Sequence, residues 1–213
     1  MDKIDVKKSM PSYRARHGSF ELVEVPPLQY LMLDGHGDPN SSPDFASAVA
    51  TLYPLAYSLK FFSRNELGRD YVVPPLEGLW WAEDMSTFTS ARDKTQWDFT
   101  LMLLVPDWLN RSHLDHAIAV ATGRRPLPRL DDVRFDILRE GTCMQTLHIG
   151  PFDDGAAVLD HMHSAAIPAG GFEMTGRHHE IYLSDLRRSA PEKLRTILRQ
   201  PVQTPPLGNH ADE

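Results

Sequence analysis

The sequence is poor in cysteine, in long apolar runs and in basic residues, and each shortage excludes a class of protein. Its one cysteine, Cys143, cannot form an internal disulfide, which suits a reducing cytoplasm. Residues 1–20 lack the apolar core of a signal peptide. The longest apolar run, 101–106, is far shorter than the ~20 residues that span a bilayer. We therefore predict a soluble, cytoplasmic protein.

The charge and composition are those of an acidic globular protein. There are 22 Lys and Arg against 29 Asp and Glu, and this net charge of −7 disfavours nucleic acid and anionic membranes as partners. Hydrophobic residues make up 41% of the chain and charged residues 24%, which excludes wholesale disorder. A chain of 213 residues can bury a core without disulfides. We expect one domain over 20–202, between an N-terminal surface arm (1–19) and a flexible tail (203–213).

The first half of the chain predicts the element order β-β-α-β-β. Strands over 20–25 and 28–34 lead into a glycine-containing loop, and Ser42 followed by Pro43 begins a helix. Pro54 predicts a kink or break in that helix, because proline lacks the N–H that the helix needs. The later elements of this half are strands over 71–73 and 79–81 around a turn at 74–78, a buried strand over 96–105, and a helix that is capped by Asp107 and ends at Gly123.

The second half predicts the same order again. Its elements are strands over 133–138 and 144–149, a helix with an apolar stripe over 158–166, and strands over 172–175 and 178–184. Ser189 and Glu192 fit a capping box for a short C-terminal helix that carries Leu194 and Ile197. We predict an α+β fold of two β-β-α-β-β repeats, at about 20–126 and 127–186, related by a pseudo-twofold axis. Their antiparallel sheets would carry the helices on one face and leave a ligand pocket on the other, where the repeats meet.

The segment 178–185 holds the most informative candidate site residues. Successive side chains of a strand face opposite sides, so with Ile181 and Leu183 toward the helices, His178, Glu180 and Tyr182 share the open face. Among aromatic walls, a desolvated Glu180 would serve as a general base near neutral pH or as a counterion for a lipophilic cation. The pattern leaves open the alternative that Glu180 is simply exposed on a solvated strand face.

Aromatic residues supply the candidate walls of the pocket. Trp80 and Trp81 are adjacent in a strand and must face opposite sides, so one of them lies outside the core, in a pocket wall or an interface. Tyr53 and Tyr57 are four residues apart on the first helix and form a stripe that fits either core packing or ligand contact.

The histidines do not show the spacing of a metal site. His161 and His163 are two residues apart on a helix and point in different directions, and no cysteine cluster accompanies them. We therefore predict neither a metal nor another cofactor.

Three stretches carry a resemblance to a known family: DGHGDP at 34–39, PPLEGLWWAE at 74–83 and HHEIYLSD at 178–185. They resemble the GyrI-like small-molecule-binding family, and the likeness extends from about residue 3 to residue 202. The resemblance implies two SHS2-type repeats around a central pocket. The effector-binding domains of multidrug-responsive transcription regulators have this arrangement, and a pocket glutamate meets lipophilic cations there. Glu180 falls at the position of that glutamate.

The chain differs from those regulators because it offers no helix-turn-helix and is acidic, so the resemblance implies a stand-alone ligand protein or enzyme. The branch that it resembles most includes cyclopropanoid hydrolases, which protect bacteria from DNA-alkylating spirocyclopropane antibiotics. Two other functions stay open. One is sequestration of lipophilic or cationic drugs without catalysis, and the other, suggested only by the family's name, is interaction with gyrase.

The resemblance to cyclopropanoid hydrolases also implies roles for individual residues. Glu180 would orient and deprotonate the attacking water, and Tyr182 or His178 would donate a proton to the drug's carbonyl oxygen. A flat, hydrophobic, drug-like molecule would be the partner, without a cofactor. The residues expected to bind it are Trp80, Trp81, Tyr53, Tyr57 and, as a second carboxylate near the mouth, Glu77.

Overall fold

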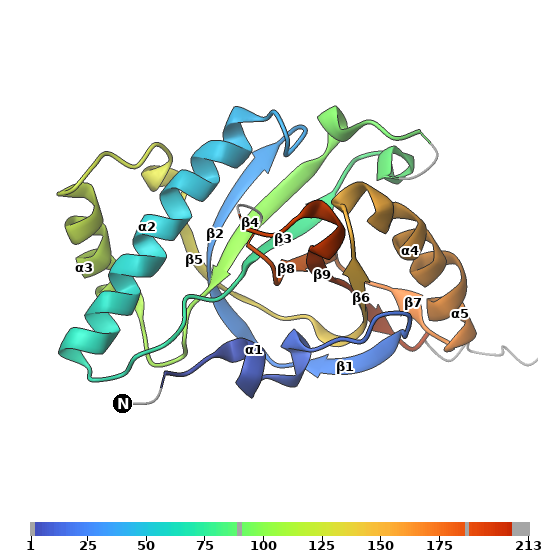
Figure 1. The fold of residues 1–213 in the computed structure, drawn as a ribbon, viewed down its shortest axis with the longest axis horizontal. Helices are drawn as coiled ribbons and strands as arrows, with labels where there is room; N and C mark the ends of the chain where they lie inside the picture. Colours follow the sequence, from blue (N-terminus) through green and yellow to red (C-terminus); the bar gives the residue numbers. More distant parts are fainter. Residues whose placement is uncertain (1–2, 89–90, 186–187, 206–213) are drawn as a thin grey trace, which may run out of the picture.

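A computed structural model describes residues 3–88, 91–185 and 188–205 (Figure 1). Its strands form a strongly curled antiparallel sheet in the order β1-β6-β9-β8-β3-β4-β2-β5, with β7 paired to β9. The strands are β1 (Glu21–Val25), β2 (Leu28–His36), β3 (Leu76–Trp81), β4 (Asp98–Leu104), β5 (Arg134–Leu138), β6 (Gly141–Ile149), β7 (Glu173–Met174), β8 (His178–Tyr182) and β9 (Arg195–Gln203). The predicted α+β class with antiparallel strands is confirmed.

The strand order agrees with two β-β-α-β-β units. It reads the same in reverse when β1 is exchanged with β5, β2 with β6, β3 with β8, and β4 with β9. The seam between the units is the antiparallel pair β3 and β8, in which Gly78 lies opposite Glu180. The first strand of each unit pairs with the other unit, because β1 joins β6 and β5 joins β2. The two units are thus joined at the seam and at both edges.

The two longest helical regions lie on the same face of the sheet (Figure 1). Helix α2 (Pro43–Glu66) packs on β2 and β4 through a core that includes Leu52, Leu55 and Phe99. In the second unit, α4 (Gly155–His161) continues through a π-helical segment, η6 (Met162–Ala166), into α5 (Ile167–Ala169), and packs on β6 and β9. Helix α3 (Arg111–Thr122) packs beside α2. Across the described residues, helices with the length and apolarity to cross a membrane are absent.

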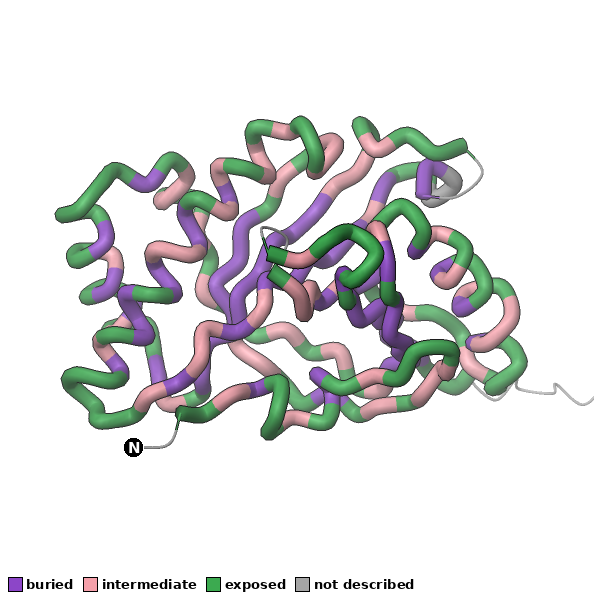
Figure 2. The backbone as a smooth tube through the Cα atoms, viewed as in Figure 1, coloured by how far each residue is buried: buried purple, intermediate pink, exposed green. Residues whose placement is uncertain are grey.

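Short helical turns complete the chain. They are α1 (Val6–Ser9), η1 (Pro11–Tyr13), η2 (Met85–Phe88), η3 (Lys94–Gln96), η4 (Leu130–Asp132), η5 (Phe152–Asp154) and η7 (Pro191–Lys193). The stretch 1–19, which we expected to be a surface arm, includes α1 and η1, and Val6 and Tyr13 are buried in a core cluster with Tyr30 and Ile197, on the face of the sheet opposite α2. Buried positions concentrate on the strands in the middle of the molecule (Figure 2). The predicted flexible tail lies mostly outside the described residues, which end at 205, and Gln203 still belongs to β9.

One prediction about the faces of the sheet is wrong. Ile181 and Leu183 do not face the helices but pack on the side of α1 and η1 with Tyr30 and Ile197. Glu180 therefore points to the face that carries the helices, and the predicted pocket on the helix-free face is incorrect. Strand alternation separates two sets of side chains, but it does not tell which set the helices cover when both faces of the sheet are buried.

Several local predictions are also corrected. The expected C-terminal helix is wrong, because only the turn η7 follows Ser189 and the chain then enters β9, which pairs with both β6 and β8. This tertiary pairing overrides the local capping pattern. The expected turn at 74–78 is replaced by the start of β3 at Leu76, and Tyr71 forms only a single bridge with Ile4.

The helices begin and continue differently from the prediction at two points. Helix α2 runs unbroken over 24 residues through Pro54, so of the expected kink or break the break is wrong. Burial of α2 along its length against the sheet offsets the lost hydrogen bond of one proline. Helix α3 is capped by Asn110, whose side chain accepts a hydrogen bond from the His113 N–H, and Asp107 lies before the helix.

Candidate functional site

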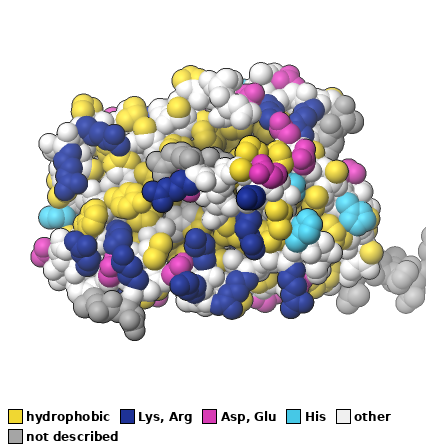
Figure 3. All heavy atoms as spheres, in the orientation of Figure 1, with side chains coloured by type: hydrophobic (Ala, Val, Ile, Leu, Met, Phe, Trp, Pro, Cys, Tyr) yellow, Lys and Arg dark blue, Asp and Glu magenta, His cyan; other side chains and the backbone are white. Residues whose placement is uncertain are grey.

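A cavity of about 1090 Å³ lies on the helix-bearing face of the sheet, between α2 and the start of α4. Its floor is the seam of β3 and β8, and hydrophobic side chains gather at the middle of this face (Figure 3). The lining side chains come from both units and include Phe45, Val49, Tyr53, Leu76, Trp80, Phe152, Leu159, Glu180, Tyr182 and Leu194. The cavity is large enough for a drug-sized molecule.

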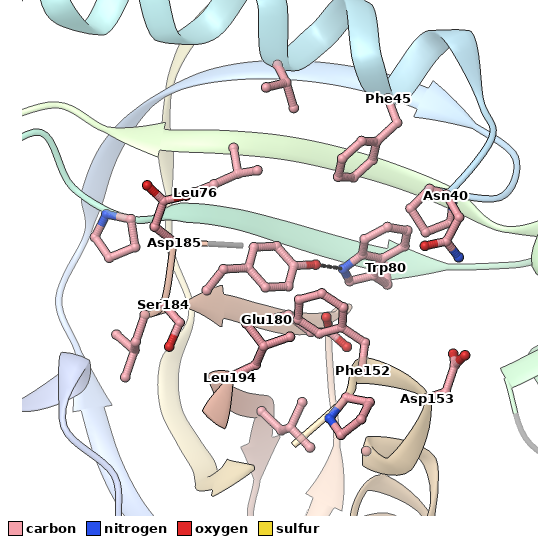
Figure 4. A pocket seen from close by; sticks show the side chains of 18 of the residues that line it. Asn40, Phe45, Leu76, Trp80, Phe152, Asp153, Glu180, Ser184, Asp185 and Leu194 are labelled. Atoms are coloured by element: carbon pink, nitrogen blue, oxygen red, sulfur yellow. Dashed lines mark hydrogen bonds between the residues drawn. The ribbon is translucent and has the colours of Figure 1, made fainter. Parts of the chain in front are cut away.

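Aromatic rings form the wall around Trp80. Phe45 and Phe152 lie on opposite sides of Trp80 in Figure 4. The Phe45 and Trp80 rings are stacked with centroids 6.4 Å apart, and Phe152 meets Tyr182 edge to face at 5.4 Å. Phe45 and Phe152 were not among the predicted site residues. Only their positions in the sequence could have indicated a site role, because Phe45 lies in the first turn of the helix after one glycine-containing loop and Phe152 lies in the other loop.

Trp81 and Glu77 do not belong to this cavity, so their predicted place in it is wrong. Successive side chains of a strand face opposite sides of the sheet. In β3, Glu77 and Trp81 each lie next to a residue of the cavity face, Gly78 and Trp80, so their own side chains point to the other face. The Arg177 guanidinium lies 3.4 Å from the centroid of the Trp81 ring. Of the two tryptophans, Trp80 is therefore the one that faces the pocket.

Glu180 places a carboxylate on the cavity wall. Its side chain is 24% exposed, and Oε1 lies 3.5 Å from Nε2 of His178. Opposite Glu180 in the sheet is Gly78, where an added Cβ would come within 2.8 Å of the Trp80 indole nitrogen and 3.3 Å of the Tyr182 hydroxyl. A glycine is therefore needed at this position for Trp80 and Tyr182 to close over the strand beside the carboxylate.

Tyr182 connects Trp80 and Glu180. Its hydroxyl oxygen accepts a hydrogen bond from the indole N–H of Trp80 at 3.0 Å, drawn as a dashed line in Figure 4. Burial, the charge of Glu180 and the hydrogen bond with that carboxylate raise the pKa of Tyr182 well above its usual value. The phenol therefore keeps its proton at neutral pH and remains a hydrogen-bond donor.

His178 lies behind Glu180 and is absent from the cavity lining among the described residues. Its side chain is 3% exposed and meets the ring of His163 edge to face at 6.0 Å. Neither ring nitrogen of His178 has a hydrogen-bond partner, and neither does Nε2 of His163. Burial and the neighbouring His178 lower the pKa of His163 to about 4, so that ring is neutral at pH 7. His178 reaches the cavity only through Glu180.

Tyr53 and Tyr57 both line the cavity, on the side of α2. Their rings are stacked at 6.4 Å, and Phe61 continues the row at 6.4 Å from Tyr57. Pro54 lies on the same wall. The proline therefore does not displace the tyrosines from the pocket side, contrary to what a break in the helix would have done.

Two cations close one end of the cavity by meeting a carboxylate of the other unit. Arg92 and Lys94 each lie 2.6 Å from Oδ1 of Asp153, which belongs to η5. The hydrogen bond with Lys94 and the charges of both cations lower the pKa of Asp153. These contacts join the connection between β3 and β4 to the loop that precedes α4.

A buried ionic network of Glu77, Glu140, His179 and Arg199 occupies the opposite face of the same strands. His179 joins the two carboxylates, with Nε2 3.0 Å from Glu77 and Nδ1 2.9 Å from Glu140. Arg199 completes the network 2.9 Å from Glu140. The hydroxyls of Tyr13 and Tyr30 donate to Glu77, so the network also holds η1 against the sheet.

Members of this network shift one another's pKa values. Burial alone would lower the pKa of His179, but the charge of Glu140 and hydrogen bonds with Glu140 and Glu77 raise it to about 9. Burial would raise the pKa of Glu140, but His179 and Arg199 lower it to about 2. Glu140, His179 and Arg199 are therefore charged together at neutral pH. No sequence motif indicated this network, because its members come from three separate strands and a turn.

Within residues 3–88, 91–185 and 188–205, no group of three or more His, Cys, Asp or Glu side chains is placed to hold a metal ion. Cys143 is buried, and burial and the charge of Glu140 raise the pKa of its thiol to about 12, which makes it a poor nucleophile. The ionisable groups that reach the cavity from the seam are thus Glu180 and Tyr182.

Comparison with known proteins identifies relatives of this arrangement. The model of the GyrI-like small molecule binding domain matches residues 99–203. An uncharacterized conserved protein from Listeria innocua is 37% identical over 94% of this chain and 100% of its own, with a TM-score of 0.85. The chain has no match among curated protein sequences.

Two further structures from Listeria innocua are described as hydrolases. One is 36% identical over 94% of this chain and 100% of its own, with a TM-score of 0.79. The other is 35% identical over 95% of this chain and 100% of its own, with a TM-score of 0.82. On the domain match and on these full-length likenesses, the chain belongs to the GyrI-like small-molecule-binding family.

Proposed function

We propose that this protein is a hydrolase that opens the cyclopropane ring of DNA-alkylating antibiotics by adding water, and so protects the cell against them. The observation that carries the proposal is the carboxylate of Glu180 on the wall of a large aromatic cavity, beside a phenol that keeps its proton. The hydrolase descriptions of the Listeria proteins support the reaction class. The cytoplasm is the compartment in which such protection of DNA is needed.

The substrate class follows from what the cavity provides. A spirocyclopropane drug has a flat apolar scaffold and a conjugated carbonyl, and Trp80, Phe45 and Phe152 offer rings on which such a scaffold can stack. Tyr53 and Tyr57 extend this wall along α2. Enclosure by aromatic rings excludes bulk water and strengthens the electrostatic influence of the one carboxylate at the seam.

Glu180 is assigned as the general base. Its carboxylate accepts a proton from a water molecule while the water oxygen forms a bond to a ring carbon of the cyclopropane. The strained C–C bond breaks, and its electron pair moves into the conjugated system, which turns the carbonyl into a phenolate. Protonation of that oxygen gives the phenol and leaves the former water as an alcohol. Ring strain and the gain of aromaticity favour this direction, so the protein needs to stabilise only a modest charge.

Tyr182 is assigned as the donor toward the developing phenolate, in preference to His178. Its hydroxyl lies on the cavity wall and its raised pKa keeps the proton available. In the described part of the chain, His178 does not line the cavity and neither of its ring nitrogens makes a hydrogen bond, so we assign it no part in proton transfer. Transfer of the proton gained by Glu180 to the deprotonated Tyr182, along the hydrogen bond between them, restores both groups after each turnover.

The second candidate is a binder that sequesters lipophilic or cationic drugs without turnover. The same carboxylate in an aromatic cavity favours it, because a cation would gain from both Glu180 and the faces of the rings. The two functions differ in product and not in affinity, so binding measurements alone do not separate them.

The test is turnover of a spirocyclopropyl cyclohexadienone by the purified protein, followed by mass spectrometry for the product that has gained one water. We expect more than one product molecule per protein. Glu180→Gln should lower kcat by about 10²- to 10⁴-fold and leave the dissociation constant nearly unchanged. Glu66→Gln, at the exposed end of α2, is the matched control and should leave the rate unchanged.

The outcomes separate the two candidates. Tight binding with no water-added product in wild type would establish the sequestering function in place of hydrolysis. Stoichiometric capture of the drug in a covalent adduct would also contradict hydrolysis. A Glu180→Gln variant that keeps the wild-type rate would show that another group is the base.

A further inference from the structure

A second cavity, of about 430 Å³, opens beside the main one between α2 and α3. The two cavities share Tyr53, Pro54, Tyr57 and Arg125 in their walls, so they adjoin each other. We call the second cavity the side arm. Its remaining wall is Ser58, Ala121 and Arg124.

The side arm presents aromatic faces that the core does not use. Tyr57 is 47% exposed although its ring stacks on that of Tyr53 and lies 6.4 Å from that of Phe61. The row of rings is set by the four-residue spacing on α2 and leads outward from the main cavity. Exposed aromatic side chains in a row beside a cavity are typical of a ligand surface.

The charge of the side arm is positive although the chain as a whole carries −7. Arg124 and Arg125 follow the end of α3, and both are exposed. Figure 3 shows Lys and Arg side chains around the hydrophobic middle of this face. In the part of the chain that the structure describes, no ion pair forms with Arg124 or Arg125, whereas Arg92 at the other end of the main cavity is neutralised by Asp153.

The position of the arginines after α3 accounts for part of this charge, because cations stabilise the C-terminal end of a helix. It does not account for the exposed ring of Tyr57 beside them or for the lining residues shared with the main cavity. An aromatic wall that ends at two unneutralised guanidinium groups matches a flat ligand with an acidic substituent, since guanidinium binds planar anions through several N–H groups.

We propose that the side arm binds an anionic group, such as a carboxylate or sulfonate, of an extended aromatic ligand whose remaining rings occupy the main cavity beside Trp80. The inference rests on the proposed function only in taking the main cavity as the ligand site. It assigns this chain a preference for aromatic anions over the corresponding neutral compounds, through Arg124 and Arg125.

The test uses two fluorescent probes that differ by one anionic group. They are 8-anilinonaphthalene-1-sulfonate and its neutral parent, N-phenyl-1-naphthylamine. We expect both to bind the wild-type protein, with the sulfonate binding more tightly. The double variant Arg124→Gln/Arg125→Gln should raise the dissociation constant of the sulfonate about five- to tenfold, the sum of two exposed ion pairs, and change that of the neutral probe less than about twofold.

A matched variant controls for the loss of two positive charges elsewhere. Lys8→Gln/Arg111→Gln removes two exposed cations that line neither cavity and should leave both affinities unchanged. A measurement on the wild type alone gives a second test that no misfolded variant can obscure. Raising the salt concentration from about 0.05 to about 0.5 M should weaken binding of the sulfonate probe and leave binding of the neutral probe unchanged.

The inference is overturned if neither probe binds the wild type, if the Arg124→Gln/Arg125→Gln variant weakens both probes equally, or if it weakens neither. It is distinguishable from the hydrolase proposal. If the protein discriminates between the probes as expected but converts no cyclopropane compound, the side-arm proposal holds and the hydrolase proposal fails. If the protein converts the cyclopropane compound but does not prefer the sulfonate, the hydrolase proposal holds and the side-arm proposal fails.

Discussion

Replacing Glu77 by glutamine should destabilise the protein severely although Glu77 lies outside the cavity. Its carboxylate is fully buried and pairs with His179, while Glu140 pairs with both His179 and Arg199. Glutamine keeps the shape of the side chain but removes one negative charge, so two cations share a single carboxylate inside the sheet. Breaking a buried pair from one side costs about 3–5 kcal/mol, a large share of the roughly 5–15 kcal/mol that stabilises a typical domain.

Urea unfolding at pH 7, followed by circular dichroism and tryptophan fluorescence, measures this loss. The exposed variant Glu66→Gln is the control and should change the free energy of unfolding by less than about 0.5 kcal/mol. The double variant Glu77→Gln/His179→Gln should cost at least about 1 kcal/mol less than the sum of the two single variants, because it removes both members of the pair. A cost below about 1 kcal/mol for Glu77→Gln, or additive costs, would refute the reasoning.

The same network sets the pH dependence of stability. The pKa of His179 rises from 6.5 to about 9 on folding, so its contribution is complete below pH 6.5 and is lost as the pH rises through about 9. The size of that loss is on the order of 3 kcal/mol. The pKa of Glu140 falls from 4.5 to about 2, so its contribution is complete above pH 4.5 and is lost as the pH falls through about 2. Unfolding by urea at a series of pH values should show the alkaline loss beginning at a lower pH in Glu77→Gln than in wild type. Equal alkaline profiles would contradict the assignment.

Other predictions concern packing around the cavity. Gly78→Ala should cost about 1–3 kcal/mol in urea unfolding and weaken binding of N-phenyl-1-naphthylamine, because its Cβ would lie 2.8 Å from the Trp80 indole nitrogen and must displace that ring. Leu52→Ala, in the fully buried face of α2, should cost about 2–5 kcal/mol, whereas the partly exposed Phe61→Ala should cost clearly less. Asp153→Asn should cost less than about 1 kcal/mol, because its ion pairs with Arg92 and Lys94 are exposed to solvent, and a larger loss would mean that this closure supports the fold itself.

Much of the fold could be predicted from periodicity and punctuation. Proline and glycine marked most strand and helix boundaries, and the strand order of the sheet agrees with two β-β-α-β-β units. The last two strands of the second unit are β8 and β9, however, and not the predicted pair over 172–175 and 178–184. The C-terminal segment could not be predicted, because its polar N-terminal turn resembles a helix start while its pairing with two strands distant in sequence decides the outcome. Local preference carries no information about such partners.

The candidate site could be predicted only in part, again because local patterns carry no information about partners that are distant in sequence. Alternation placed Glu180 and Tyr182 on one face, and the structure brings Trp80 to them across the β3 and β8 seam. It could not decide that Glu77 faces the other way, because the expected turn at 74–78 hid the register of β3. Nor could it reveal the partners of Glu77, since Glu140 and Arg199 are distant in sequence and meet only through the sheet.

The crossed edge strands make either half of the chain incomplete alone. A fragment ending near residue 126 would leave β1 without its partner β6, and would expose to aggregation the edges of β2 and β3 that pair with β5 and β8. Long-range closure of this kind slows folding but ties the whole chain into one cooperative transition. Two separately expressed fragments, cut between α3 and β5, would therefore gain their structure mainly by complementing each other, and the ligand cavity would exist only in the reassembled pair.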